Sequence, residues 1–109
     1  MVMAKSAIKT DNLYYSALLP ASSSYTSTGI TASELGKYKF ITVSCVISNA
    51  DNRNVMSVTL PTKNVLDGQT AEAPFTNDGT LEAVAYMQGG VLMYSTGTGG
   101  WKCRITLFS

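Results

Sequence analysis

Hydrophobic and polar residues alternate with a period of two over most of this chain, as they do in β-strands that bury one face. In the segment 39–48 one face is strongly apolar, and it holds Ile41, Val43, Cys45 and Ile47. The turn-forming residues 49–54 separate this segment from a second alternating run, 55–60, in which Met56, Val58 and Leu60 share a face. We expect the second strand to end at Pro61, because proline cannot donate a ladder hydrogen bond. The two runs predict an antiparallel hairpin.

A second hairpin is predicted over residues 81–94, where two alternating runs flank Gly89-Gly90, a connection suited to a tight two-residue turn. The first run places Leu81, Ala83, Ala85 and Met87 on one face. A helix over 81–87 is the alternative, since Leu, Glu, Ala and Met favour helices. On the return run, Leu92 and Tyr94 are assigned to the outer face and Val91 and Met93 to the other.

The last strand is expected over 101–108, with Trp101, Cys103, Ile105 and Leu107 facing inward. Residues 12–20 predict a first strand, and the Ser/Thr-rich residues 21–38 predict a loop or an extended edge. Short strands are expected near 64–66 and 72–75. Thr31 and Glu34 match the spacing of a helix capping box, but no apolar helical run follows them.

These elements predict an all-β fold, an antiparallel β-sandwich of jelly-roll-like type with about six to eight short strands. The length of 109 residues suits a single domain, 1–109. Residues 1–10 carry none of the alternating pattern and are expected to be either disordered or partner-binding.

Composition narrows the classes of function. Charged residues make up only 14% of the chain and the net charge is +1, so no concentrated basic face for nucleic acid is expected. Serine and threonine supply roughly a quarter of the residues, well above average usage. No apolar run is long enough for a signal peptide or a membrane span. The chain has no histidine, which removes the commonest general base and an important metal ligand.

No motif nominates a catalytic, cofactor or metal site. Gly97, Gly99 and Gly100 precede a strand instead of a helix, so we interpret them as a hairpin connection and not a phosphate-binding loop. Asp51, Asn52 and Asn54 have calcium-ligand chemistry, but their spacing fits a turn better. The carboxylates suggest no acid–base pair. Cys45 and Cys103 fall on inner faces and are expected to be reduced, buried and unreactive, and Trp101 is assigned to the core in preference to a sugar-stacking role.

The outer faces carry too many apolar side chains for plain solvent-facing strands, which predicts burial between subunits. Tyrosine and phenylalanine also suit glycan contact. We therefore take four aromatic residues as candidates for an interface or a glycan contact: Phe40, Tyr86, Tyr94 and Phe108.

From Gly29 to Phe108 the chain resembles small all-β modules of bacteriophage tail fibres, baseplates and minor virion proteins. The similarity lies in the spacing of Leu35, Tyr38, Ile41 and Val43, in the run "VMSVTLP", and in the final run "WKCRITLFS". The resemblance implies a homotrimer, or failing that a dimer, that contacts other virion proteins or a host surface glycan. It also implies assembly in the host bacterial cytoplasm.

The expected function is therefore non-enzymatic: a phage-type virion structural module for assembly or host attachment, without nucleic acid, membrane, metal or cofactor. A non-viral carbohydrate-binding β-sandwich is the alternative. A hydrolase whose site the sequence does not reveal is the third hypothesis.

Overall fold

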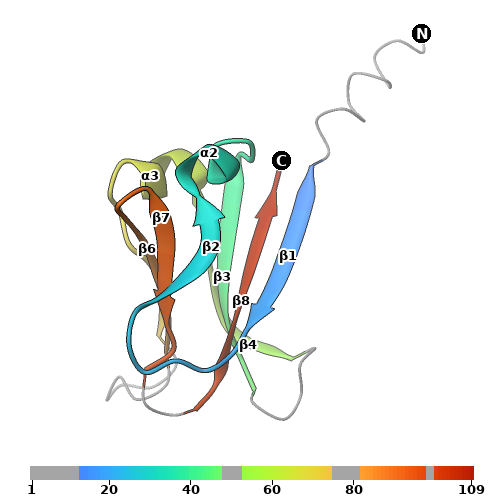
Figure 1. Cartoon of the computed structure of the whole chain (residues 1–109). Coiled ribbons are helices and arrows are strands. Elements are labelled where there is room, and N and C mark those ends of the chain that lie inside the picture. The colour runs from blue at the N-terminus through green and yellow to red at the C-terminus, as the bar shows by residue number, and fades with distance from the viewer. Residues whose placement is uncertain (1–12, 48–52, 75–81, 98–99) are drawn as a thin grey trace, which may run out of the picture.

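Two four-stranded antiparallel sheets pack face to face in a computed structural model that describes residues 13–47, 53–74, 82–97 and 100–109 (Figure 1). Eight strands and two short helices are present in these residues. They are β1 (Tyr14–Leu19), β2 (Thr26–Thr31), α2 (Ala32–Leu35), β3 (Phe40–Val46), β4 (Asn54–Pro61), α3 (Thr62–Leu66), β5 (Ala71–Pro74), β6 (Glu82–Gln88), β7 (Val91–Ser95) and β8 (Lys102–Phe108). The predicted all-β sandwich is confirmed.

The strand order is β1-β8-β3-β4 in one sheet and β2-β7-β6-β5 in the other. Pairing of β1 with β8 and of β2 with β7 nests the ends of the chain around its middle, which gives the topology its jelly-roll character. The four strands between them pair as two hairpins, β3 with β4 and β5 with β6. In Figure 1 the end of β8 lies beside the start of β1, where Phe108 pairs with Tyr14.

Both predicted hairpins are present. In β3–β4, Val43 lies opposite Val58, and the second strand ends at Pro61 as expected. In β6–β7, Gln88 lies opposite Val91, so the turn consists of Gly89 and Gly90 alone. Their φ angles of 62° and 82° are the two positive values that a type I′ turn requires and that glycine adopts freely. The alternative helix over 81–87 is excluded for residues 82–87, which belong to β6.

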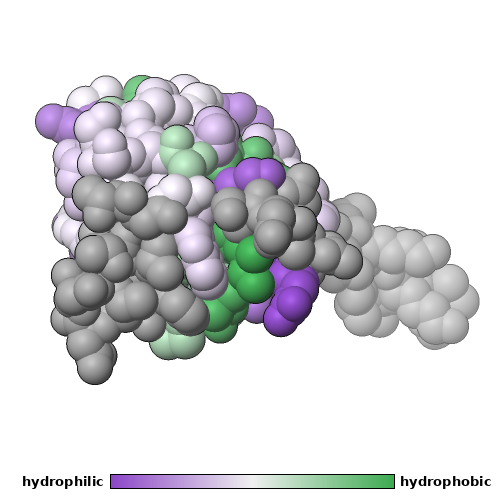
Figure 2. All heavy atoms as spheres, turned by 90° about the horizontal axis from the view of Figure 1, so that it is seen from below, coloured by the Kyte–Doolittle hydropathy of each residue, from purple (hydrophilic) through white to green (hydrophobic). Residues whose placement is uncertain are grey.

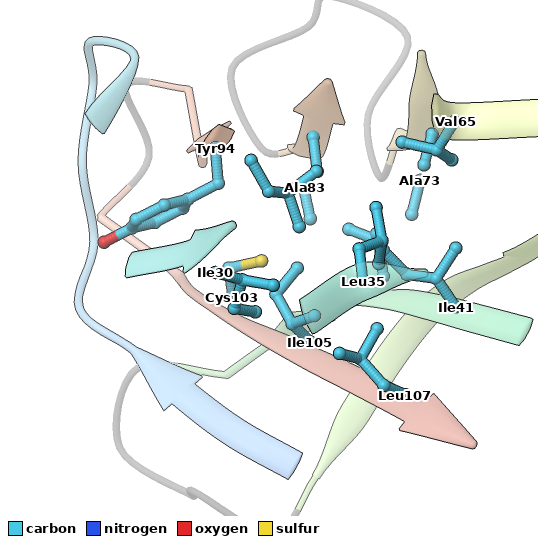
Figure 3. Packing of buried hydrophobic residues seen from close by; sticks show 14 of the residues in the cluster. Ile30, Leu35, Ile41, Val65, Ala73, Ala83, Tyr94, Cys103, Ile105 and Leu107 are labelled. Atoms are coloured by element: carbon cyan, nitrogen blue, oxygen red, sulfur yellow. The ribbon is translucent and has the colours of Figure 1, made fainter. Parts of the chain in front are cut away.

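The core fills the space between the sheets, and Tyr94 and Ile30 of one sheet pack in it together with Cys103, Ile105 and Leu107 of the other (Figure 3). The β3 and β8 faces predicted to be inward are completely buried; they supply Ile41, Val43, Cys45, Cys103, Ile105 and Leu107. Opposite them, the buried core residues of β5 and β6 are all alanines, which leaves room for Leu35 and Val65. Trp101 is half-buried and packs against this cluster, in agreement with its predicted core role.

The two faces of β7 were assigned the wrong way round. Leu92 and Tyr94 are buried, with exposed fractions of 0% and 2%, whereas Val91 and Met93 are half-buried on the outer face. All four residues of the run are apolar, so alternation alone does not distinguish its faces. The two-residue turn does distinguish them, because it places Tyr94 opposite Ala85, and opposed residues share a face of the sheet.

The helices α2 and α3 cover one end of the sandwich (Figure 1) and correct two further expectations. The capping box does begin a helix: Thr31 Oγ1 accepts from the Glu34 amide, and Glu34 Oε1 accepts from the Thr31 amide. That helix is one turn long, and it buries Leu35 completely. The short strand expected near 64–66 is instead part of α3, whose buried Thr62 and Val65 are spaced by three residues as in a helix.

The glycine-containing link after β7 is not a hairpin connection. β7 and β8 belong to different sheets, so the chain crosses the sandwich between Ser95 and Lys102. Gly97 and Gly100 have φ angles of 72° and 81°, which explains the choice of glycine there. Gly99 lies outside the described residues, as do residues 1–12, Asp51, Asn52 and Leu81.

Candidate functional site

The outer face of the β1-β8-β3-β4 sheet begins, at the helix-covered end, with a row of ring side chains that crosses all four strands. The strand register aligns Tyr14 with Phe108, Phe108 with Phe40, and Phe40 with Pro61. The rings of Phe40 and Phe108 stack with their centroids 5.5 Å apart and an interplanar angle of 27°. Tyr14 is 71% exposed and Phe40 is 39% exposed. We call these four residues, three aromatic side chains and the proline ring of Pro61, the aromatic row.

Hydroxyl side chains occupy the next positions on the same face. Thr42 and Thr59 share a hydrogen bond of 2.8 Å between their Oγ1 atoms, and the Oγ1 of Thr106 lies 3.4 Å from Ser16 Oγ. One row further, a bond of 2.8 Å joins the hydroxyls of Ser44 and Ser57. Because these hydroxyls bond to one another, they keep a hydrogen-bond partner when another surface covers them, whereas hydroxyls bonded only to water would lose theirs. The exposed part of this face is therefore polar but inexpensive to bury, whereas Ser44 and Val46, further along β3, are already buried within the chain.

The far end of the face is cationic. Lys102 and Arg104 alternate with the inward Cys103, and both are half-buried. Arg104 Nε donates to Asn54 Oδ1 over 3.3 Å. The face therefore has one aromatic end and one end with two basic side chains.

The structure brings together two of the four predicted site residues. Phe40 and Phe108 form the centre of the aromatic row. Tyr86 lies on the outer face of the other sheet, where its ring meets Tyr25 edge-on at 4.8 Å and its hydroxyl donates to Gln88 Oε1 over 3.0 Å. These positions do not test whether either pair of rings binds anything.

Tyr94 is the site residue that the structure contradicts. It lies in the core, so it is not available as a surface contact. Its hydroxyl points to the segment that joins β1 and β2 (Figure 3) and donates to the carbonyl oxygen of Pro20 over 2.7 Å. Burial raises the pKa of Tyr94, with a further contribution from Cys103. Its role in this structure is packing and anchoring.

Sequence reasoning missed Tyr14, which extends the aromatic row, and Tyr25, which pairs with Tyr86. Tyr14 meets Phe108 only because the first and last strands pair in one specific register, and no local pattern encodes that register. Tyr25 precedes β2 in a segment taken as loop or extended edge, and its neighbour Tyr86 lies on a different strand of the same sheet.

A hollow of about 100 Å³ opens between the edge strands β1 and β2, next to α2. Ile30 and Leu107 supply its apolar part, and Tyr15, Tyr38 and Glu34 supply its polar groups. Hydrogen bonds from the backbone and then the side chain of Thr31, together with the positive charge of Lys37, hold the pKa of Glu34 below its usual range. The carboxylate is thus an ionised group in a fixed position.

The two cysteines lie opposite each other on β3 and β8, and both are buried free thiols as predicted. Burial, with a smaller contribution from Cys45, raises the pKa of Cys103 to about 12, and burial also raises that of Cys45. A nucleophilic cysteine needs the opposite shift, towards the thiolate. The pair is therefore chemically suited to packing.

Metal-ligand clusters, ion pairs and membrane-spanning helices can be assessed only in the part of the chain that the structure describes. It contains no group of three or more Cys, Asp or Glu residues placed to hold a metal ion. The carboxylate of Asp67 pairs with Lys63 over 2.9 Å in a solvent-exposed contact on α3. No described helix has the length and apolar character to cross a membrane.

Strongly hydrophilic residues form only small, separate groups at the end of the sandwich away from the helices, and most of the coloured surface there is of intermediate hydropathy (Figure 2).

Comparison with protein-family models, with curated proteins and with solved structures gave no match. The candidate function therefore rests on the chain's own surfaces.

Proposed function

We propose that this protein is a non-enzymatic structural module that associates with copies of itself through the outer face of β1-β8-β3-β4, as a component of a phage-type virion. The aromatic row is the observation that carries the proposal. A monomeric domain seldom leaves a contiguous apolar strip across a whole sheet, since such a patch favours association.

The positions of the aromatic and basic side chains favour one orientation of self-association. A twofold axis in the plane of the interface and perpendicular to the strands would place the aromatic row of each copy over Lys102 and Arg104 of the other. Arg104 and Phe108 are four residues apart on β8, or about 14 Å, so the two ends are well separated. Basic side chains stack favourably on aromatic rings, whereas a twofold axis parallel to the strands would place the basic side chains of the two copies over one another. The face therefore complements itself in one orientation.

The size of the face indicates a weak contact. Four strands about 4.8 Å apart and seven residues of about 3.4 Å each give an upper limit near 450 Å² per copy, because part of the face, at Ser44 and Val46, is already buried. A standard stable interface buries about 800 Å² per partner. The isolated protein should therefore dimerise only at high concentration, whereas an assembled particle would add further contacts around each copy.

The virion setting is supported by the similarity of residues 29–108 to phage all-β modules, and localisation to the virion is part of the same proposal. The resemblance implies a trimer, but one self-complementary flat face supports a twofold dimer. A glycan-binding module is the second candidate, because the exposed rings of Tyr14 and Phe40 also suit a sugar.

Sedimentation equilibrium between about 5 μM and about 1 mM tests the proposal, since this range covers micromolar to millimolar dissociation constants. We expect a monomer–dimer equilibrium that Phe40→Thr weakens strongly. Met56→Thr is the matched control, because Met56 is 44% exposed but lies on the opposite face of the same sheet. A monomer at every concentration, or equal effects of the two substitutions, would contradict assembly through this face.

A further inference from the structure

The hollow between β1 and β2 has the composition of a binding site for a small cation. Of the described residues that line it, Glu34 alone carries a charge, and that charge is negative. Tyr15 and Tyr38 contribute two aromatic rings, and Ile30 and Leu107 contribute apolar surface. A positively charged group with an apolar exterior would match each of these components.

Glu34 is held in place for this role by the start of α2. Its Oε1 accepts from the amide of Thr31 at 3.0 Å and from the Thr31 hydroxyl at 3.1 Å. Both bonds use the same carboxylate oxygen, and no hydrogen bond within the described residues uses Oε2. The carboxylate therefore keeps its position and its charge while one oxygen remains open to a ligand.

The size of the hollow limits the ligand to one compact group. A sphere of about 100 Å³ has a radius near 3 Å, far below the roughly 300–1,000 Å³ of pockets for drug-sized ligands. Aromatic rings attract a positive charge within about 6 Å of their centres, a distance comparable with the dimensions of this hollow. A group of this kind is the head of a larger molecule whose remainder stays in solvent.

We propose that this hollow binds a compact alkylammonium head group of the choline type, with Glu34 as the counter-charge and the rings of Tyr15 and Tyr38 against its methyl groups. A phosphate or carboxylate ligand is disfavoured because Glu34 would repel it. A neutral sugar is disfavoured because a full ring needs more space and several directed hydrogen bonds. This site is separate from the aromatic row, so the test of cation binding does not depend on whether the protein self-associates.

Titration of the isotopically labelled full chain with choline chloride, followed by amide chemical shifts at constant ionic strength, tests the site. We expect saturable shifts clustered at Thr28, Gly29 and Glu34, with a dissociation constant in the range of about 1–50 mM that suits a single weak contact. The carbon isostere 3,3-dimethylbutan-1-ol, which has the same shape without the charge, should bind at least fivefold more weakly.

Glu34→Gln removes the charge but keeps the capping box, since glutamine serves at that position as well as glutamate does. This variant should bind choline at least fivefold more weakly, whereas Glu72→Gln, on the exposed face of β5, should bind normally. Absence of saturable shifts, equal binding of the neutral alcohol, or an unchanged Glu34→Gln titration would overturn the proposal. Saturable binding of a methyl glycoside in place of choline would overturn it in favour of a sugar site.

Discussion

The buried Tyr94 hydroxyl provides a quantitative test of the corrected β7 register. In Tyr94→Phe the ring stays in the core, and the 2.7 Å hydrogen bond to the Pro20 carbonyl is lost. One hydrogen bond of this kind contributes about 0.5–1.5 kcal/mol net. For a domain of this size, 1 kcal/mol corresponds to a melting temperature change of roughly 4–8 °C. We therefore expect Tyr94→Phe to melt several degrees below the wild type.

Tyr94→Ala removes the ring as well, and it should cost about 3–5 kcal/mol, as large-to-small substitutions of buried aromatic residues do. Thermal denaturation followed by circular dichroism measures both variants, with Tyr14→Phe as the control because Tyr14 is 71% exposed. Surface substitutions usually change stability by no more than about 0.5 kcal/mol. Values that small for both Tyr94 variants would place the side chain on the outer face and refute the register.

Three further predictions concern the helix cap and the buried thiols. Thr31→Ala removes the N-cap of α2 and should destabilise the fold by about 1 kcal/mol in urea denaturation, whereas the exposed Ser33→Ala should have little effect. Cys103 stays neutral in the folded protein up to a pKa of about 12 but ionises near its ordinary value of 9.0 when unfolded. The stability that this shift contributes is therefore complete below pH 9 and is lost as the pH rises towards 12. We expect the unfolding free energy of Cys103→Ala to fall less steeply than that of the wild type over this pH range. Equal slopes for the two proteins would contradict the burial of the Cys103 thiol. Neither Cys45 nor Cys103 should react with iodoacetamide in the native state, and rapid labelling seen by mass spectrometry would show that the inner faces of β3 and β8 are accessible.

Local alternation was sufficient to predict much of the fold. The inner faces of β3 and β8 followed directly from the sequence because every second residue there is apolar, and most residues between them are polar. The β6–β7 turn was predictable because Gly89-Gly90 fits one turn type. The prediction of the inner face of β7 was wrong because Val91, Leu92, Met93 and Tyr94 are all apolar. The two-residue turn fixes the pairing of β7 with β6, and that pairing would have identified the inner face.

The candidate site was harder to predict because it depends on pairings between distant segments. Tyr14 and Phe108 are neighbours only through the pairing of β1 with β8, and the hollow combines β1, β2, α2 and β8. The short helices were missed for a different reason: one turn is too short to display a helical period, even where a capping box marks its start. Long-range register therefore limits what a single sequence reveals about a β-sandwich surface.

The contribution of Phe40 to the free energy of dimerisation can be approximated from the exposed area of its side chain. Phe40 exposes 39% of a side chain of about 200 Å², or about 80 Å². At about 25 cal/mol per Å², covering that area in both copies of a dimer contributes up to about 4 kcal/mol. Loss of this contribution in Phe40→Thr would weaken dimerisation by up to about a thousandfold.

Concentration-dependent amide chemical shifts of the wild-type protein test the central claim most directly, because they report both association and the surface involved. Between about 10 μM and about 1 mM, a range that spans a weak dimer equilibrium, we expect shifts at Phe40, Thr42, Thr106 and Phe108. Residues on the outer face of the other sheet, such as Tyr86, should not shift. A spectrum independent of concentration, or shifts confined to the β2-β7-β6-β5 sheet, would contradict self-association through the aromatic row.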